Sequence, residues 1–565
     1  MHRISKYVAV VAAGLLGSLL VTASDAERTS DKTSTCRGSA PRAVMLTGSA
    51  FAQPAHDHGS RDKGRALGEV QFQTSCSLAA HRRFNDGMLY QHSFWYRAAK
   101  QAFDETLQAD AQCAIAYWGI AQSLLLNPFG PPSPKNLADG LAALEKGEAS
   151  GAGSEREQDF IRALKTFFAE HKKRSHRERL QLYVKAMGEV AARYPQDDEA
   201  QIYYALALNV AASPTDKTYA LPLKAAALLE PIFHRKPQHP GVAHYLVHSY
   251  DYPPIAEKGI EAARRYAAIA GSSPHALHMP SHIFTRVGHW RESIASNLIS
   301  AKTAKDDNEP DDQLHAMDYL VYAHLQLAQD EKAREALEEM RNMAGVNMAR
   351  HTGPFALAAS AARYTMELGD WTAAARLPVS ATRFGHVDAI SHFARAIGAA
   401  RSGSLDAAKT EIAKLNELSE KLRGAGEAYW AEQVDIQRQV AEAWALYAQD
   451  KHQEALHILQ AAADAEDRTD KHVVTPGPLI PSRELYGAML LSQGQHREAL
   501  AAFEATLQKE PNRLGAMLGA AKAAEQGGST DRARHHYQSA LTMVGDAGAS
   551  RPELSEARLF LSRRR

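Results

Sequence analysis

The C-terminal part of the chain repeats itself every 34 residues. Three kinds of position recur at this distance: a glycine, a small alanine and a large aromatic residue (Gly494 and Gly528, Ala499 and Ala533, Phe503 and Tyr537). A period of about 20–50 residues is typical of solenoids, in which each repeat buries its apolar face only against its neighbours. Glycine suits a turn between two helices, and alanine lets the second helix approach the first. The period therefore predicts stacked helix-turn-helix units.

The composition favours helices along the whole chain. The protein has 565 residues, too many for one ordinary core, and 45% of them are hydrophobic. From about Gly68 onward, segments of roughly 12 to 18 residues rich in alanine and leucine alternate with turns that contain Pro, Gly and Asp. Lys and Arg total 65, as do Asp and Glu, so no positive surplus exists to neutralise nucleic-acid phosphates. We expect an all-α protein whose main partner is not nucleic acid.

The same register recurs upstream. Inter-helix turns are predicted at 288–292, 369–371 and 403–405, and a first repeat contains Gly87, Tyr90, Ala99 and Phe103. Together with the C-terminal copies, these residues resemble the tetratricopeptide repeat family over roughly residues 75–550. The resemblance implies a right-handed superhelical solenoid in which the first helix of each repeat lines a concave surface. It implies no particular activity, because a fold does not determine a function.

Five segments are predicted along the chain. They are a signal peptide (1–26), a disordered linker (27–66), N-terminal repeats with insertions (67–235), central histidine-rich repeats (236–345) and C-terminal repeats (346–565). Arg3 and Lys6 precede an apolar stretch from Val8 to Val21, and small residues follow up to Ala26, as in an export signal. The stretch is short for a membrane span, and no later segment is apolar enough for one. The mature protein is expected to be periplasmic or secreted.

Two cysteines, Cys76 and Cys113, lie in the predicted repeats. Both precede predicted helices that would lie side by side, and an exported protein folds where disulfides form. The sequence allows either a disulfide that ties the first repeat together or two buried thiols.

Histidines cluster at the positions that the tetratricopeptide resemblance places on the concave surface. Pro240, Pro274 and Leu314 are predicted to begin three successive repeats. Their inward positions hold His244 and His248 in the first repeat, His275, His278, His282 and Arg286 in the second, and His315, Asp318, Tyr319 and Tyr322 in the third. A His-x-x-x-His pair thus occurs twice, at an offset of one repeat.

This spacing suits a metal ion. Side chains four residues apart share one helix face, and neighbouring helix axes lie about 8–10 Å apart, so imidazoles from two helices can meet. We predict a site for Zn, Cu, Ni or Fe formed by His244, His248, His278, His282, His315 and Asp318. The residues predicted to contact a ligand are His275, Arg286, Tyr319 and Tyr322. Two other interpretations stay open: a polar ligand groove without metal, and hydrogen bonding that serves the structure alone.

Several segments resemble a group of exported bacterial tetratricopeptide proteins: Cys76, residues 92–96, Cys113 with 116–119, and residues 278–283. This resemblance implies the fold and the compartment, and no activity. The sequence contains no Gly-rich phosphate loop, no Gly-x-Ser-x-Gly elbow and no His-Glu-x-x-His helix, so no nucleotide cofactor is expected.

Two functional hypotheses follow from these residues. The first is a solenoid that binds a transition metal, which could assist chemistry on a small-molecule ligand held in the groove. The second is an adaptor that binds a peptide or a partner protein in the concave groove without chemistry. The residues leave open whether the protein is an enzyme.

Overall fold

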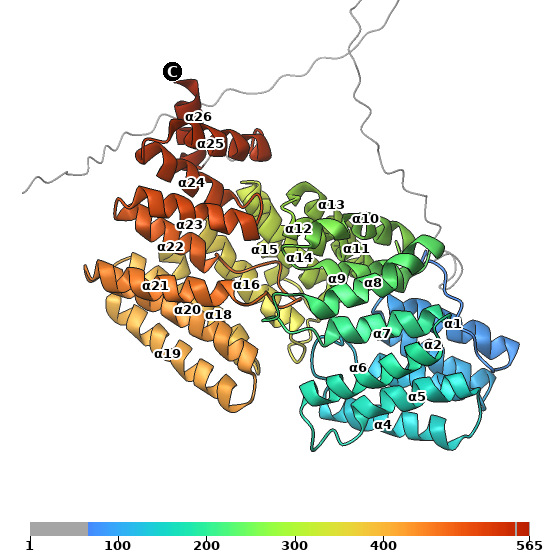
Figure 1. Ribbon diagram of the computed structural model, residues 1–565. Coiled ribbons are helices and arrows are strands. Elements are labelled where there is room, and N and C mark those ends of the chain that lie inside the picture. Colours follow the sequence, from blue (N-terminus) through green and yellow to red (C-terminus); the bar gives the residue numbers. More distant parts are fainter. Residues whose placement is uncertain (1–65, 548–550, 564–565) are drawn as a thin grey trace, which may run out of the picture. The chain divides into compact units, whose positions relative to one another are not determined.

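The computed structural model describes residues 66–547 and 551–563, and the predicted signal peptide lies outside them. Within these residues, every regular element is a helix (Figure 1). The N-terminal helices are α1 (Leu78–His92), α2 (Tyr96–Ala109), α3 (Ala114–Leu124), α4 (Pro134–Ala149), α5 (Glu155–Phe168), α6 (His176–Arg193), α7 (Asp198–Val210) and α8 (Ala220–Arg235).

The remaining helices follow in two further sets. The central set comprises α9 (Pro240–Tyr250), a 3-10 turn (Ala256–Gly259), α10 (Ile260–Ile269), α11 (Pro274–His278), α12 (Pro280–Arg286), α13 (Trp290–Asp306), α14 (Pro310–Gln326) and α15 (Asp330–Arg341). The C-terminal set comprises α16 (Thr352–Glu367), α17 (Trp371–Ala374), α18 (Gly385–Arg401), α19 (Leu405–Gly424), α20 (Ala428–Tyr447), α21 (His452–Asp467), α22 (Ser482–Ser492), α23 (His496–Lys509), α24 (Leu514–Gln526), α25 (Thr530–Val544) and α26 (Pro552–Ser562).

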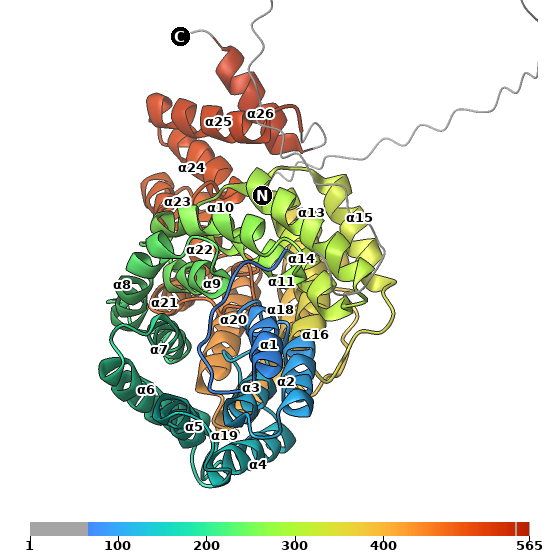
Figure 2. The same ribbon diagram turned by 90° about the vertical axis from the view of Figure 1, so that its right-hand side faces the viewer.

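Helices that follow one another in the sequence pack side by side, as the repeat pattern predicts (Figures 1 and 2). Four central helices begin with a proline in the first turn, where a backbone N–H has no helical partner: Pro240, Pro274, Pro280 and Pro310. The third repeat is predicted to begin at Leu314, but its helix α14 already begins at Pro310, because a proline followed by the acidic Asp311 and Asp312 suits the first turn of a helix. Among the described residues, no helix is long and apolar enough to cross a membrane.

The core is divided along the chain, as expected for repeats that bury their apolar faces on their neighbours. One cluster of buried apolar side chains extends from Val70 to Phe284, and a second extends from Phe355 to Ala557. A smaller cluster of α14 and α15 side chains lies between them in sequence. The candidate site lies at the C-terminal end of the first cluster.

The turn between α12 and α13 touches the turn between α23 and α24. Gly288 has a φ of +69°, and a Cβ there would lie 2.2 Å from the carbonyl oxygen of Pro511. The indole N–H of Trp290 donates to the Asn512 carbonyl oxygen at 2.8 Å. Only glycine fits this approach, which brings C-terminal repeats against the central ones.

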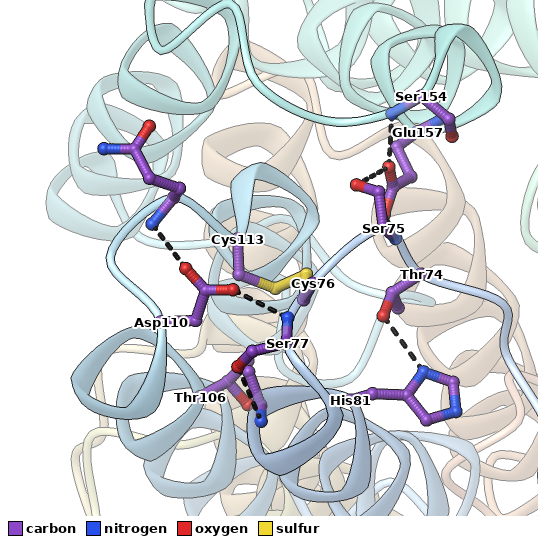
Figure 3. Close-up of a disulfide and its surroundings, with 12 residues drawn as sticks. Thr74, Ser75, Cys76, Ser77, His81, Thr106, Asp110, Cys113, Ser154 and Glu157 are labelled. Atoms are coloured by element: carbon purple, nitrogen blue, oxygen red, sulfur yellow. Dashed lines mark hydrogen bonds between the residues drawn. A yellow bond between two sulfur atoms is a disulfide. The ribbon is translucent and has the colours of Figure 1, made fainter.

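Cys76 and Cys113 form a disulfide with their Cα atoms 4.9 Å apart (Figure 3). Beside it, Asp110 caps two backbone N–H groups: that of Ser77 at 2.7 Å and that of Gln112 at 3.0 Å. The segment that enters α1 is therefore tied to the turn between α2 and α3.

Candidate metal centre

The predicted histidines gather where α9, α11, α12 and α14 meet, and they form two groups of three. Triad 1 contains His244 and His248 from α9 and His275 from α11. Triad 2 contains His278 from α11, His282 from α12 and His315 from α14. Within each triad, one ring nitrogen per histidine lies within 4.8 Å of the others. His275, which the sequence suggests as a ligand contact, thus stands among the potential metal ligands.

In triad 1 the Nε2 atoms face one another. His244 Nε2 lies 3.1 Å from His248 Nε2 and 3.2 Å from His275 Nε2. His244 Nδ1 lies 2.7 Å from the carbonyl oxygen of His92, which can only accept, so the proton is on Nδ1 and Nε2 has a free lone pair. The buried Nδ1 of His248 has no hydrogen-bond partner, so this ring can carry its proton on Nε2.

In triad 2, hydrogen bonds fix two tautomers. His278 Nδ1 donates to Asn297 Oδ1 at 2.7 Å, and the Asn297 amide is itself oriented because its Nδ2 donates to the Ser293 carbonyl oxygen at 2.8 Å. His282 Nδ1 donates to Asp251 Oδ2 at 3.0 Å. Both Nε2 atoms therefore lack protons, yet they lie 3.0 Å apart. Two lone pairs at this distance repel each other unless a cation binds them.

Asp251, which orients His282, binds two cations as well. It accepts from Arg286 Nε at 2.8 Å and from Lys471 Nζ at 3.2 Å. Burial opposes ionisation of Asp251, but Lys471 and Arg286 outweigh it and hold the pKa of the carboxyl well below 3.8. Burial lowers the pKa of Lys471 to about 8. Arg286, predicted to contact a ligand, thus stabilises the carboxylate behind His282, and Lys471 arrives from residues 468–481, between α21 and α22.

All six histidines favour the neutral form. Burial lowers the pKa of each below 6.5, and neighbouring histidines lower it further for all except His282, where Asp251 raises it in part. Neutral imidazole is the form that coordinates metal ions. Tyr319 packs on the same group, since its hydroxyl lies 3.4 Å from His282 Nε2 and donates to the Thr475 carbonyl oxygen at 3.2 Å.

A cavity of about 150 Å³ lies beside both triads. Its lining includes His248 and His275 from triad 1, and His282 and His315 from triad 2. The rest of the lining combines aromatic, aliphatic and charged side chains, among them Phe94, Phe129, Met279, Glu309, Asp312 and Arg350. Rings of both triads therefore border the same cavity.

Two residues predicted for the site face other partners. Asp318 Oδ1 accepts from Arg363 Nη1 at 2.7 Å and from Ser360 Oγ at 3.0 Å, and Asp318 belongs to neither triad. The hydroxyl of Tyr322 accepts from Arg513 Nη1 at 3.2 Å. Both predictions are corrected for the same reason: arginines from later repeats approach α14 and bind these side chains.

Sequence reasoning missed a third group, formed by His92, Glu199 and His239. His239 Nδ1 accepts the N–H of Val242, so its proton is on Nε2, which donates to Glu199 Oε1 at 2.9 Å. His92 bonds through Nε2 to Glu199 Oε2 at 3.2 Å and through Nδ1 to Tyr245 at 3.0 Å. Because these nitrogens already have hydrogen-bond partners, we interpret the group as structural. Spacing could not reveal it, since His92 and Glu199 are 107 residues apart.

Comparison with known protein families supports the repeat architecture of the C-terminal part of the chain. Residues 490–549 match the family model described as tetratricopeptide repeat. This segment is a tetratricopeptide repeat. The matched residues cover the region in which the 34-residue period occurs. Together with the helices upstream, they form an all-α solenoid. The histidines of the two triads belong to the upstream helices. No curated protein matches the sequence.

Three solved structures are similar along most of the chain. They are the APC/C hetero-tetramer Cut9–Hcn1 (12% identity, 85% of this chain and 97% of that chain, TM-score 0.29), the human IFIT1 dimer with m7Gppp-AAAA (12%, 85% and 99%, 0.34) and the TPR domain of P58(IPK) (13%, 86% and 98%, 0.21). Likenesses at these TM-scores carry no argument about function.

Proposed function

We propose that this protein binds transition-metal ions, one at each histidine triad. The observation that carries the proposal is the pair His278 and His282, whose unprotonated Nε2 atoms lie 3.0 Å apart. A hydrogen bond cannot join these atoms, because the single proton of each neutral ring is on Nδ1 and is donated to Asn297 or to Asp251. A metal ion converts the repulsion between the two lone pairs into two coordination bonds.

The donor set indicates which metals fit. Each triad offers three neutral nitrogens and neither a thiolate nor a carboxylate. Three histidines with an open fourth position suit zinc and copper, and imidazole also binds iron and nickel. The oxygens that accept from Nδ1 of His244, His278 and His282 are the kind of outer partner that orients metal-binding histidines.

Export to an oxidising compartment is part of this proposal. The disulfide between Cys76 and Cys113 supports it, because structural disulfides persist mainly outside the reducing cytosol. The predicted signal peptide at 1–26 is the sequence feature that agrees with it.

The adaptor hypothesis has less support at the triads. Solenoids bind partners on extended, open surfaces. His244, His278 and His282 are at most 2% exposed and face one another. Protein binding by the C-terminal tetratricopeptide repeats is a separate question, on which the triads have no bearing.

Elemental analysis of the mature, untagged protein tests the metal proposal. After loading with Zn or Cu and removal of loosely held metal, we expect about two ions per chain in the wild type and about one in either His275→Ala or His315→Ala. Both histidines are only half-buried, so these replacements disturb packing less than changes at His278 or His282. Circular dichroism verifies that helicity is retained.

The matched control is His457→Ala, which removes an exposed histidine from α21. It should retain the full metal content. Equal metal content in all four proteins would show that the ions bind elsewhere, and a wild type without metal would overturn the proposal.

A further inference from the structure

The two triads adjoin each other. The ring centroids of His248 and His282 lie 6.2 Å apart, and those of His275 and His278 lie 6.3 Å apart. His275 and His278 are separated by one turn of α11, so a single short helix supplies a ligand to each triad. Ions held by the two triads are therefore near neighbours.

Both ions would have an open position toward the same space. Three nitrogen ligands leave at least one coordination site free on zinc or copper. Two rings of each triad line the single cavity of about 150 Å³. A molecule small enough to enter this cavity can reach both ions at once.

The protein supplies little negative charge to balance two cations there. The six ligands are neutral, and Asp251 is already bound by Arg286 and Lys471. Of the carboxyl groups that line the cavity, Glu309 pairs with Arg97. The other one, Asp312, shares this lining with Arg350, whose positive charge offsets it. Two divalent ions close together in this environment require an anion from solution.

We infer that the two triads form one two-metal centre and that the cavity binds a small inorganic anion which bridges both ions. The inference rests on the proposed metal-binding function. The bridge fills both open positions and offsets the repulsion between the ions. Paired metal ions in proteins lie about 3.5–4 Å apart, a distance that hydroxide or azide can span.

Copper provides the test, because two Cu(II) ions joined by a bridge lose most of their paramagnetic signal. The mature protein is loaded with Cu(II), freed of loosely bound copper and measured by elemental analysis and by integrated electron paramagnetic resonance, with and without azide. We expect about two coppers per chain and, with azide, a spin count at least fivefold below the copper count. His275→Ala and His315→Ala should each hold about one copper with one full spin per copper, whether azide is present or not.

The outcomes separate the two proposals. Two coppers that keep one full spin each in the presence of azide would overturn the two-metal centre and leave metal binding intact. A wild type that binds no copper, zinc, nickel or iron would overturn both. A spin count that also falls in the single-triad variants would overturn the two-metal centre, because a lone ion has no partner for coupling.

Discussion

Replacing Asn297 by alanine tests whether triad 2 is oriented for a metal ion. Asn297 is fully buried, and its Oδ1 accepts the Nδ1 proton of His278 at 2.7 Å. Without this oxygen, the imidazole is free to turn and its N–H has no good acceptor. Ser281 Oγ, at 3.5 Å from the same nitrogen, is the nearest replacement and is too distant for a strong hydrogen bond.

Two effects of known size should follow. Loss of an outer hydrogen-bond partner lowers the metal affinity of a histidine site about 10–100-fold, or about 1.4–2.7 kcal/mol. A buried donor left without an acceptor also costs about 1–3 kcal/mol of unfolding free energy in the metal-free protein. Affinity is measured by competition with a chromogenic chelator in the His275→Ala background, where triad 2 alone binds metal. Unfolding free energy is measured by urea denaturation without metal.

Two variants control for the change in stability. Asn297→Asp keeps an oxygen acceptor for His278 and should keep the affinity within a few-fold of the parent. Gln326→Ala removes another fully buried amide, which bonds to Leu514 and Glu367, and should lower stability without lowering affinity. The reasoning is refuted if Asn297→Ala binds zinc as tightly as its parent, or if Gln326→Ala loses as much affinity.

Three further changes have defined outcomes. Gly241→Ala should reduce the metal content from about two ions to about one, because its Cβ would lie 2.3 Å from Nδ1 of His92, whose carbonyl oxygen orients a ring of triad 1. His386→Phe should make the stability of the fold less sensitive to acid. Burial and neighbouring histidines lower the pKa of His386 to about 2. Below pH 6.5 the unfolded chain therefore binds a proton that the folded chain does not, and the free energy of unfolding falls as the pH falls. At pH 5, urea titrations should show that the variant lacks the loss of about 2 kcal/mol of unfolding free energy that acid causes in the wild type. The double change Cys76→Ala with Cys113→Ala removes a disulfide that links residues 37 positions apart. The unfolded chain gains conformational entropy, which should lower the free energy of unfolding by about 4 kcal/mol and lower the Tm measured by calorimetry.

Each of these changes has its own control. Gly424→Ala, where an added Cβ meets nothing within 4 Å, should keep both ions, and an equal loss of metal there would exclude steric displacement of His92 as the cause. Replacement of the exposed His457 by phenylalanine should leave the acid dependence unchanged. Reduced wild type should match the double cysteine variant, and an unchanged Tm in both would mean that the disulfide adds no stability.

The part of the site that sequence predicts is the part made by local contacts. The pairs His244 with His248 and His278 with His282 follow from helical periodicity, since side chains four residues apart share one face. Packing of each hairpin on the next one brings His275 to the first pair. The 34-residue period predicts helical hairpins for the same reason, because each repeat buries its apolar face on its neighbour.

Contacts between segments that are distant in the sequence limit how much of the site can be predicted from it. The sequence places Asp318 on the same helix face as His315, but Arg363, in a later helix, takes its carboxylate. No periodicity connects Lys471 with Asp251, although this ion pair lies directly behind His282. The partition into two triads depends on side-chain directions and on these long-range partners, and spacing alone shows neither.

The position of these partners along the chain also orders the two sites in time. The three ligands of triad 1 and the His92 carbonyl oxygen that orients one of them all lie at or before residue 275. Triad 2 needs His315, and the carboxylate behind His282 receives its second cation only when Lys471 follows, 220 residues after Asp251. A chain that folds from its N-terminus therefore completes the first site well before the second. The same separation makes the second site depend on the C-terminal part of the chain, since Lys471 supplies a positive charge to the carboxylate that orients His282.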